Sequence, residues 1–171
     1  TITRYKQVKT QRESQLHVFK SAAQQEARTA NGRRVEVAAN VGEIASARDA
    51  MENGAEGIGL LRTEFLYLED SQPPSEEKQF RIYREIFEVM KGHPVIVRTL
   101  DIGGDKPPSY LSIPQEMNPF LGWRAIRISL DEPDLFKTQL RAILRAAVEH
   151  NARIMFPMVS DLDELRRARD I

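Results

Sequence analysis

The sequence predicts an α/β protein in which a long helix precedes four consecutive strand–helix units. Two observations carry this prediction. Short, nearly unbroken apolar runs alternate with segments of helical periodicity, and the chain is 41% hydrophobic and 29% charged, as is typical of a folded domain. Strands that are apolar on both faces and alternate with helices indicate a parallel sheet covered by helices. The apolar runs are residues 35–41, 57–61, 95–97 and 154–159.

The leading segment, residues 1–32, is polar and has its first glycine at Gly32. A loose helical stripe runs along it, so we predict a long, mostly exposed helix that ends near Asn31 and Gly32. This helix is expected to be a linker or an arm packed on the body. The stripe consists of Tyr5, Val8, Leu16, Phe19 and Ala23.

The next two helices carry clear boundary signals. Segment 43–53 is predicted to be helical because its apolar residues share one face and Gly54 follows its end. Ser75 is expected to cap a second helix, whose first turn carries Glu76 and Glu77 and which ends at 92–94. The apolar face of this second helix is Phe80, Tyr83, Phe87 and Met90.

The second half of the chain begins with an irregular stretch over 101–119 that is rich in Gly and Pro. Helical periodicity resumes over 123–128, and a new helix is expected to begin at 131–133. A last helix is expected over 162–170, with Ser160 or Asp161 as its cap. The restarted helix has a strong amphipathic stripe of Phe136, Leu140, Ile143, Leu144 and Ala147.

Two architectures fit this order of elements, an open doubly wound sheet and a βα-barrel. The first strand is not followed by the glycine pattern of dinucleotide-binding folds, because Gly57 and Gly59 lie inside a strand that leads into Leu-Leu-Arg. No phosphate-binding loop of the Gly-x-x-x-x-Gly-Lys-Ser/Thr type occurs either. Both architectures remain open on these grounds.

Composition excludes several classes of function. The formal net charge of +0 argues against non-specific binding to nucleic acid or to anionic membranes. Because the chain has no cysteine, disulfides, thiolate metal sites and a cysteine nucleophile are excluded within it. No apolar run approaches the length of a membrane span, and the polar start lacks a signal-peptide core. We therefore expect a soluble cytoplasmic protein without membrane insertion.

Two Arg-Thr pairs follow apolar strands at equivalent positions, Arg62 with Thr63 and Arg98 with Thr99. Ligands of parallel α/β folds bind at the carboxyl ends of the strands, and a guanidinium fork matches phosphate and carboxylate oxygens. Two such forks at one mouth predict a ligand with two or more negative charges. The alternative is that each arginine pairs with an internal acid, such as Glu64 or Asp101; we favour the anion site because two matching positions occur.

Other charged residues give weaker signals. Lys106 on a Gly-Gly loop is either a phosphate ligand or part of an ordinary turn, and one of Arg124 and Arg127 is expected to reach the pocket. The acids of this region, Glu64, Asp101 and Asp105, are few for a closed metal site. The three histidines, His17, His93 and His150, are isolated and are interpreted as surface or cap residues.

Segments 54–65, 97–106 and 118–127 together resemble the phosphoenolpyruvate-utilising enzymes. The Ile-Gly-Gly-Asp-Lys continuation of the second segment narrows the resemblance to the phosphoenolpyruvate–protein phosphotransferases, the Enzyme I class of the bacterial sugar phosphotransferase system. The resemblance implies a (β/α)8 barrel that binds phosphoenolpyruvate and Mg²⁺. Residues 33–171 would then be its first four strand–helix units, since such a barrel takes about 250 residues, and 1–32 its leading or linker helix.

By the same resemblance, Arg62, Arg98, Arg124 and Lys106 match residues that bind the substrate. The phosphoryl group would pass to a histidine of a separate N-terminal domain and then to the carrier protein HPr for sugar uptake. The Mg²⁺ ligands, the catalytic cysteine and much of a homodimer surface would lie beyond Ile171, so the chain alone is expected to be inactive. Alternatives are a pyruvate phosphate dikinase or phosphoenolpyruvate synthase-type enzyme, or a non-catalytic barrel fragment.

Overall fold

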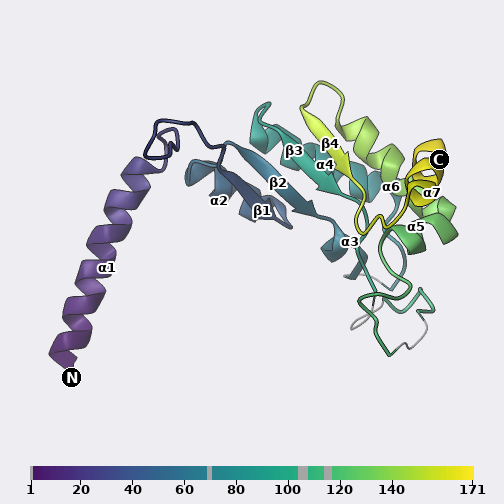
Figure 1. Ribbon diagram of the computed structural model, residues 1–171, viewed down its shortest axis with the longest axis horizontal. Coiled ribbons are helices and arrows are strands. Elements are labelled where there is room, and N and C mark those ends of the chain that lie inside the picture. Colours follow the sequence, from purple (N-terminus) through teal and green to yellow (C-terminus); the bar gives the residue numbers. More distant parts are fainter. Residues whose placement is uncertain (1, 69–70, 104–107, 114–116) are drawn as a thin grey trace.

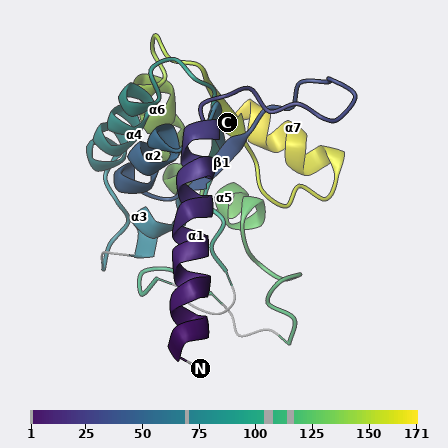
Figure 2. The ribbon, with the colours of Figure 1, turned by 90° about the vertical axis from the view of Figure 1, so that its left-hand side faces the viewer.

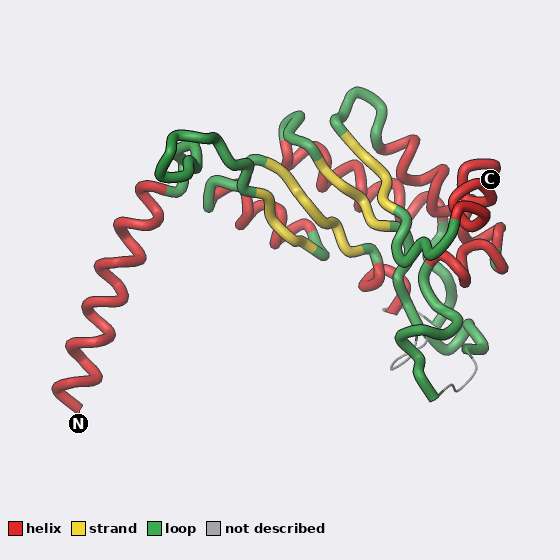
Figure 3. Tube along the Cα trace, viewed as in Figure 1, coloured by secondary structure: helices red, strands yellow, loops and turns green. Residues whose placement is uncertain are grey.

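The computed structural model describes the chain except residues 1, 69–70, 104–107 and 114–116, and it has an α/β architecture (Figures 1 and 3). Its four strands form one parallel sheet in the spatial order β1-β2-β3-β4, which is also their order along the chain. The predicted parallel sheet is thereby confirmed. The elements are α1 (Ile2–Ala22), β1 (Ala38–Val41), α2 (Ile44–Glu52), β2 (Gly57–Arg62), α3 (Glu64–Leu68), α4 (Glu76–Met90), β3 (Val95–Arg98), α5 (Ile126–Asp131), α6 (Pro133–Ala146), β4 (Ala152–Met155) and α7 (Leu162–Asp170).

The helices that connect the strands gather on one face of the sheet. Helix α4 lies between α2 and α6 and contacts both, and all three lie on the same side of the strands (Figures 1 and 2). On β1, Ala39 and Val41 pack into the core, whereas Asn40 points to the other face and is exposed, as the alternation of a strand requires. A doubly wound sheet has helices on both faces and a reversal in strand order, and the described strands show no such reversal.

The main core lies between the sheet and these three helices. Ile58, Leu61 and Val97 of the strands meet Phe87 of α4 and Ile143 of α6, and each of these side chains is at most 1% exposed. Fully burying a side chain of this size contributes about 1.5–3 kcal/mol, so the strand–helix units hold one another in place. A second, smaller cluster joins α5, α6 and α7 through Ile126, Leu130, Phe136 and Ala168.

The predicted caps explain where two helices begin. The Ser75 hydroxyl accepts a hydrogen bond from the Lys78 amide at 3.2 Å and starts α4. Asp161, rather than Ser160, caps α7, because its carboxylate accepts from the amides of Asp163 and Glu164 at 2.8 Å each. Both caps satisfy backbone donors that a helix start leaves without partners.

Helix α1 projects away from the sheet (Figure 1), and the prediction that it runs to Asn31 and Gly32 is wrong. It ends at Ala22 because the following residues pack on the end of α2, where the Gln24 side-chain amide donates to the Glu52 carbonyl at 3.0 Å. Gly32 (φ 86°) instead lies in a turn closed by the Arg28–Arg34 bridge. None of the described helices is long and apolar enough to span a membrane.

Three element boundaries differ from the predictions for identifiable reasons. Strand β1 begins at Ala38 instead of 35, because the Val35 amide donates to the Ala27 carbonyl and not to the sheet. Strand β4 covers Ala152–Met155 instead of 154–159, since Pro157 has no amide hydrogen for a ladder. Helix α5 starts at Ile126 instead of 123, because Ala125 has a positive φ of 54°.

Candidate functional site

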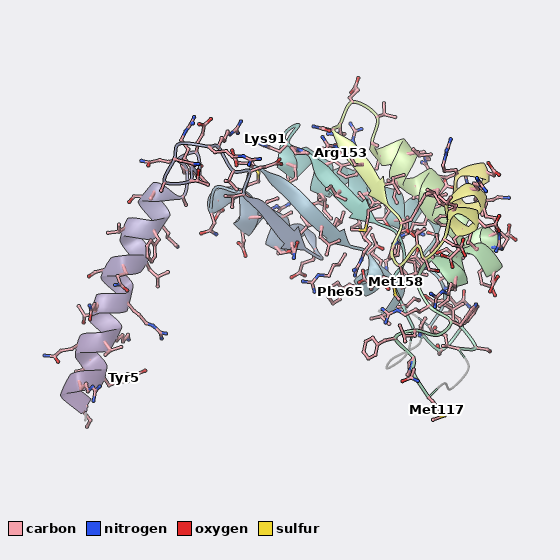
Figure 4. The ribbon with its side chains drawn as sticks, viewed as in Figure 1. Tyr5, Phe65, Lys91, Met117, Arg153 and Met158 are labelled. Carbon is pink, nitrogen blue, oxygen red and sulfur yellow. The ribbon has the colours of Figure 1, made fainter. Side chains whose placement is uncertain are left out.

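The two predicted arginines end neighbouring strands and are register partners, Arg62 on β2 and Arg98 on β3. Parallel strands present their carboxyl ends at one edge of the sheet, so both guanidinium groups leave the sheet at that edge. Figure 4 shows Phe65 and Met158 at this edge, while Arg153 lies toward the opposite one. The convergence of the two Arg-Thr pairs is therefore as predicted.

Arg98 is held by two carboxylates. Its guanidinium forms ion pairs with Glu64, the first residue of α3, and with Asp101, at 3.0 Å from Asp101 Oδ2. The other Asp101 oxygen accepts from Arg124 at 2.8 Å. These four side chains are only 10–20% exposed, so their charges lie largely outside water and need partners of opposite sign.

Arg62 has a different environment. Its side chain is exposed, and its guanidinium makes no hydrogen bond or ion pair with any residue that the structure describes. It lines a cavity of about 480 Å³ together with Asn40, Gly42 and Phe65. The internal pairing considered as an alternative thus occurs for Arg98 and, within the described residues, not for Arg62.

Arg124 reaches the cluster through a close backbone contact. The Ala125 amide donates to the Ile102 carbonyl at 3.1 Å, which joins the chain after β3 to the chain before α5. Gly103 has a φ of 151°, and a Cβ atom there would lie 2.2 Å from the Cβ of Arg124. Only glycine fits this position, and its absent side chain allows Arg124 to approach Asp101.

Three buried polar atoms of the cluster lack a hydrogen-bond partner among the described residues: Nε of Arg98, Nε of Arg124 and Oε2 of Glu64. An unsatisfied buried donor costs about 1–3 kcal/mol. Both Nε atoms are donors with positive charge, so the cluster retains capacity to bind anionic oxygen beyond its internal ion pairs. Phe120 adds an aromatic ring whose centroid is 5.5 Å from the Arg124 guanidinium.

The other charged residues that the sequence singled out do not all join this cluster. Arg127 donates to the carbonyls of Leu121 and Gly122 at 2.6 and 2.7 Å, so it supports the loop and Arg124 is the one that joins the cluster. Lys106 and Asp105 lie outside the described residues. His93 contacts the Glu56 carbonyl at 3.0 Å.

Of the other histidines, His150 lies beside Phe87 with its ring tilted by 39° and the centroids 5.7 Å apart, and the His17 side chain is not among those described. In proteins Mg²⁺ takes oxygen ligands, chiefly from carboxylates. Across the described part of the chain, no three His, Cys, Asp or Glu side chains are grouped to hold a metal ion. Glu64 and Asp101 are both engaged by arginines. The described residues therefore do not form a Mg²⁺ site.

Sequence reasoning missed a buried polar network behind the arginines. Gln139 of α6 and Gln79 of α4 are 1% and 0% exposed, and hydrogen bonds connect them through the Tyr83 hydroxyl. Burial raises the pKa of Tyr83 and of Tyr67, which also donates to Gln79, so both phenols stay neutral. The missed signal was a polar residue, Gln139, on the apolar face of an amphipathic helix.

Comparison with known proteins identifies the family. Residues 17–171 match the family described as "PEP-utilising enzyme, PEP-binding domain". Over 170 residues, 99% of this chain, the sequence is 51% identical to a protein of Bacillus sp. (strain S). It is 57% identical over 141 residues, 82% of the chain, to one of Staphylococcus carnosus, and 54% identical over 143 residues, 84% of the chain, to one of Priestia megaterium.

All three relatives are named phosphoenolpyruvate-protein phosphotransferase. The matched region is only 25–29% of their length. The family match, in contrast, extends over nearly all of this chain and includes Arg62, Arg98 and Arg124. The chain therefore belongs to the PEP-utilising enzymes, and it carries sequence of their phosphoenolpyruvate-binding domain.

Proposed function

We propose that the chain is part of the phosphoenolpyruvate-binding domain of a phosphoenolpyruvate–protein phosphotransferase. The observation that carries the proposal is the register pairing of Arg62 with Arg98 at the carboxyl edge of the sheet, with the Arg62 guanidinium unpaired among the described residues. The names of the relatives support this enzyme over a dikinase or synthase with the same arginines. They also favour it over a non-catalytic module.

The guanidinium groups at this edge of the sheet suit phosphoenolpyruvate, which carries a phosphate and a carboxylate. Arg62 supplies a guanidinium fork that has no partner in the described part of the chain, while Arg98 and Arg124 each retain a buried Nε donor. Phosphoryl transfer depends mainly on positioning the group and on neutralising charge on its oxygens. Glu64 and Asp101 hold Arg98 and Arg124 in place before the ligand arrives, and Lys106 is proposed as a further phosphate ligand.

The proposed setting is a (β/α)8 barrel, of which residues 33–171 form the first four units and residues 1–32 a leading or linker segment. The unreversed strand order and the placement of α2, α4 and α6 on one face support it, because barrel helices form a single outer layer. In this setting the open face of the sheet, which carries Asn40, would face the barrel interior.

The remaining steps require parts of a longer protein. We propose that the phosphoryl group passes to a histidine of another domain and then to HPr, in a cytoplasmic homodimeric enzyme of sugar uptake. Mg²⁺ would be bound by residues outside the described part of this chain and would neutralise phosphate charge. The role of the described residues is to bind and orient the anion through the three arginines.

Calorimetric titration of phosphoenolpyruvate into the full-length protein with Mg²⁺ tests the proposal. Binding is expected in the wild type and lost in Arg62→Ala, and Arg62→Lys is expected to bind weakly because an ammonium lacks the planar fork. Arg81→Ala is the matched control, since the Arg81 side chain is 74% exposed and, among the described residues, pairs only with Glu77 across one helical turn. Wild-type affinity in Arg62→Ala would overturn the assignment.

The chain of residues 1–171 alone provides a second arm of this test. It is expected to show weak or no Mg²⁺-dependent binding, because the metal ligands are proposed to lie elsewhere. Tight, metal-dependent binding by this chain would contradict that placement and would require a metal site within it.

A further inference from the structure

A single buried amide, that of Gln139 on α6, connects the carboxyl ends of β2 and β3. Its Oε1 accepts a hydrogen bond from the Leu100 amide at 2.9 Å, just after β3. Its Nε2 donates to the Thr63 hydroxyl at 3.0 Å, just after β2. The Thr63 hydroxyl in turn donates to the carbonyl of Arg98 at 2.9 Å.

Each of these contacts falls next to one of the charged residues at the strand ends. Thr63 stands between Arg62 and Glu64, and Leu100 immediately precedes Asp101. The carbonyl reached through Thr63 belongs to Arg98 itself. A shift of Gln139 would therefore move the backbone from which the cluster side chains project.

The hydrogen bonds of Gln139 take over from those of the β2–β3 ladder at the point where this ladder ends. The β2–β3 ladder has Arg62 and Arg98 as its last pair. Thr63, directly after Arg62, and Leu100, two residues after Arg98, are 1% and 2% exposed. Buried polar groups beyond a ladder need other partners, because losing them costs about 1–3 kcal/mol each. Gln139 supplies these partners from the helical layer.

The orientation of the amide is fixed by what it contacts. Leu100 offers an N–H and requires an acceptor, so Oε1 must face it. Nε2 then has two hydrogens for two hydroxyl acceptors, Thr63 at 3.0 Å and Tyr83 at 3.3 Å. The reversed amide would place two donors against each other, so the network defines one arrangement.

We infer that Gln139 is a positioning residue, which sets the spacing and direction of Arg62 and Arg98 for the phosphate of phosphoenolpyruvate. The inference rests on the proposed function. Gln139 does not touch the ligand in this assignment and acts through the backbone of both strand ends. Displacing a substrate-binding group by about 1 Å can lower the rate about a hundredfold, so the effect is expected in substrate use as well as in stability.

Gln79 on α4 provides a matched control in the same network. It is also fully buried, and its side chain bonds to the Pro74 carbonyl at 3.0 Å and to the hydroxyls of Tyr67 and Tyr83 at 3.1 and 3.2 Å. None of these partners belongs to a strand end. Methionine resembles glutamine in length and lacks its hydrogen bonds, so Gln139→Met and Gln79→Met remove comparable interactions without opening a large cavity.

The experiment compares Gln139→Met, Gln79→Met and wild type in the full-length protein, with kcat/KM for phosphoenolpyruvate and Tm as readouts. Both variants are expected to lower Tm, as a purely structural role would. Only Gln139→Met is expected to lower kcat/KM, by about tenfold to a hundredfold. Equal kcat/KM in the two variants would overturn the inference.

A second readout separates the inference from the proposed function. If wild-type protein shows no phosphoryl transfer from phosphoenolpyruvate, the proposed function fails. The positioning role of Gln139 is then tested by the NMR signal of the Arg98 Nε–H group in ligand-free protein. A shift of this signal in Gln139→Met but not in Gln79→Met would support positioning. The same signal in both variants and wild type would refute it.

Discussion

Arg62 and Arg98 form the last register pair of the β2–β3 ladder, and only Arg98 is paired with carboxylates within the described chain. The two guanidinium groups therefore differ in freedom although their backbones are equivalent. Arg98 is held by Glu64 and Asp101, whereas the long side chain of Arg62 lines an open cavity. One guanidinium is thus fixed by ion pairs, and the other has no ion pair among the described residues, so the two differ in the part that each would play in the anion binding that we propose.

Asp101→Asn is expected to destabilise the fold. Asp101 is shared by two largely buried arginines, and removing one partner of such a pair costs about 3–5 kcal/mol because a charge stays buried without compensation. Urea unfolding measures the loss. The control is Glu77→Gln, whose pair with Arg145 at 3.1 Å is exposed and should cost less than about 1 kcal/mol. Equal losses in the two variants would contradict a structural role for Asp101.

Gly103→Ala is expected to displace Arg124 and to weaken phosphoenolpyruvate binding. A Cβ at Gly103 would meet the Cβ of Arg124 at 2.2 Å, and φ is also positive there. Gly92→Ala is a matched control, because Gly92 has a φ of 86° but nothing within 4 Å of its added Cβ. The control should lose about 1–2 kcal/mol from backbone strain alone. Calorimetry and urea unfolding of both variants compare the effects, and similar binding in both would count against the contact.

The ion pairs between α4 and α6 predict a pH-dependent contribution to stability. Hydrogen bonds from Arg145 and then Arg141 lower the pKa of Glu76. A carboxylate whose pKa is lower in the folded chain stabilises it above the unfolded pKa, and this contribution is lost as pH falls through the folded value. Glu76→Gln should therefore lower Tm at neutral pH and have little effect under acidic conditions below the folded pKa.

Thermal unfolding followed by circular dichroism at several pH values measures this dependence. Glu52→Gln on α2 serves as a control, because the Glu52 side chain makes no ion pair with any described residue. A Tm difference for Glu76→Gln that stays constant from neutral to acidic pH would contradict the assignment.

The sheet, its direction and the arginine pair could be predicted because they depend on local patterns. Apolar runs and helix periodicity identify strand–helix units, and parallel strands necessarily bring Arg62 and Arg98 to one edge. The prediction failed where a tertiary contact decides. Helix α1 stops at Ala22 because the residues after it contact the end of α2, and Arg124 precedes α5 because Ala125 adopts a positive φ.

The internal partners of the cluster could not be predicted for a similar reason. Whether Arg98 or Arg62 pairs with Glu64 depends on the direction of the chain at the start of α3, which no sequence pattern encodes. In the sequence Gln139 is a polar residue within an apolar stripe, and its role becomes visible only when Thr63 and Leu100 are placed beside it.

The contacts at Gly103 and Arg124 also bear on how the long excursion between β3 and α5 can change. The chain leaves and returns at one point, where the Ala125 amide bonds to the Ile102 carbonyl and Asp101 pairs with Arg124. Because this base is closed, the entropic cost of closing the loop grows only slowly as residues are added beyond it. Insertions or deletions far from the base are therefore expected to be tolerated without moving Arg98 or Arg124, so this region can diversify while the charged cluster stays constant.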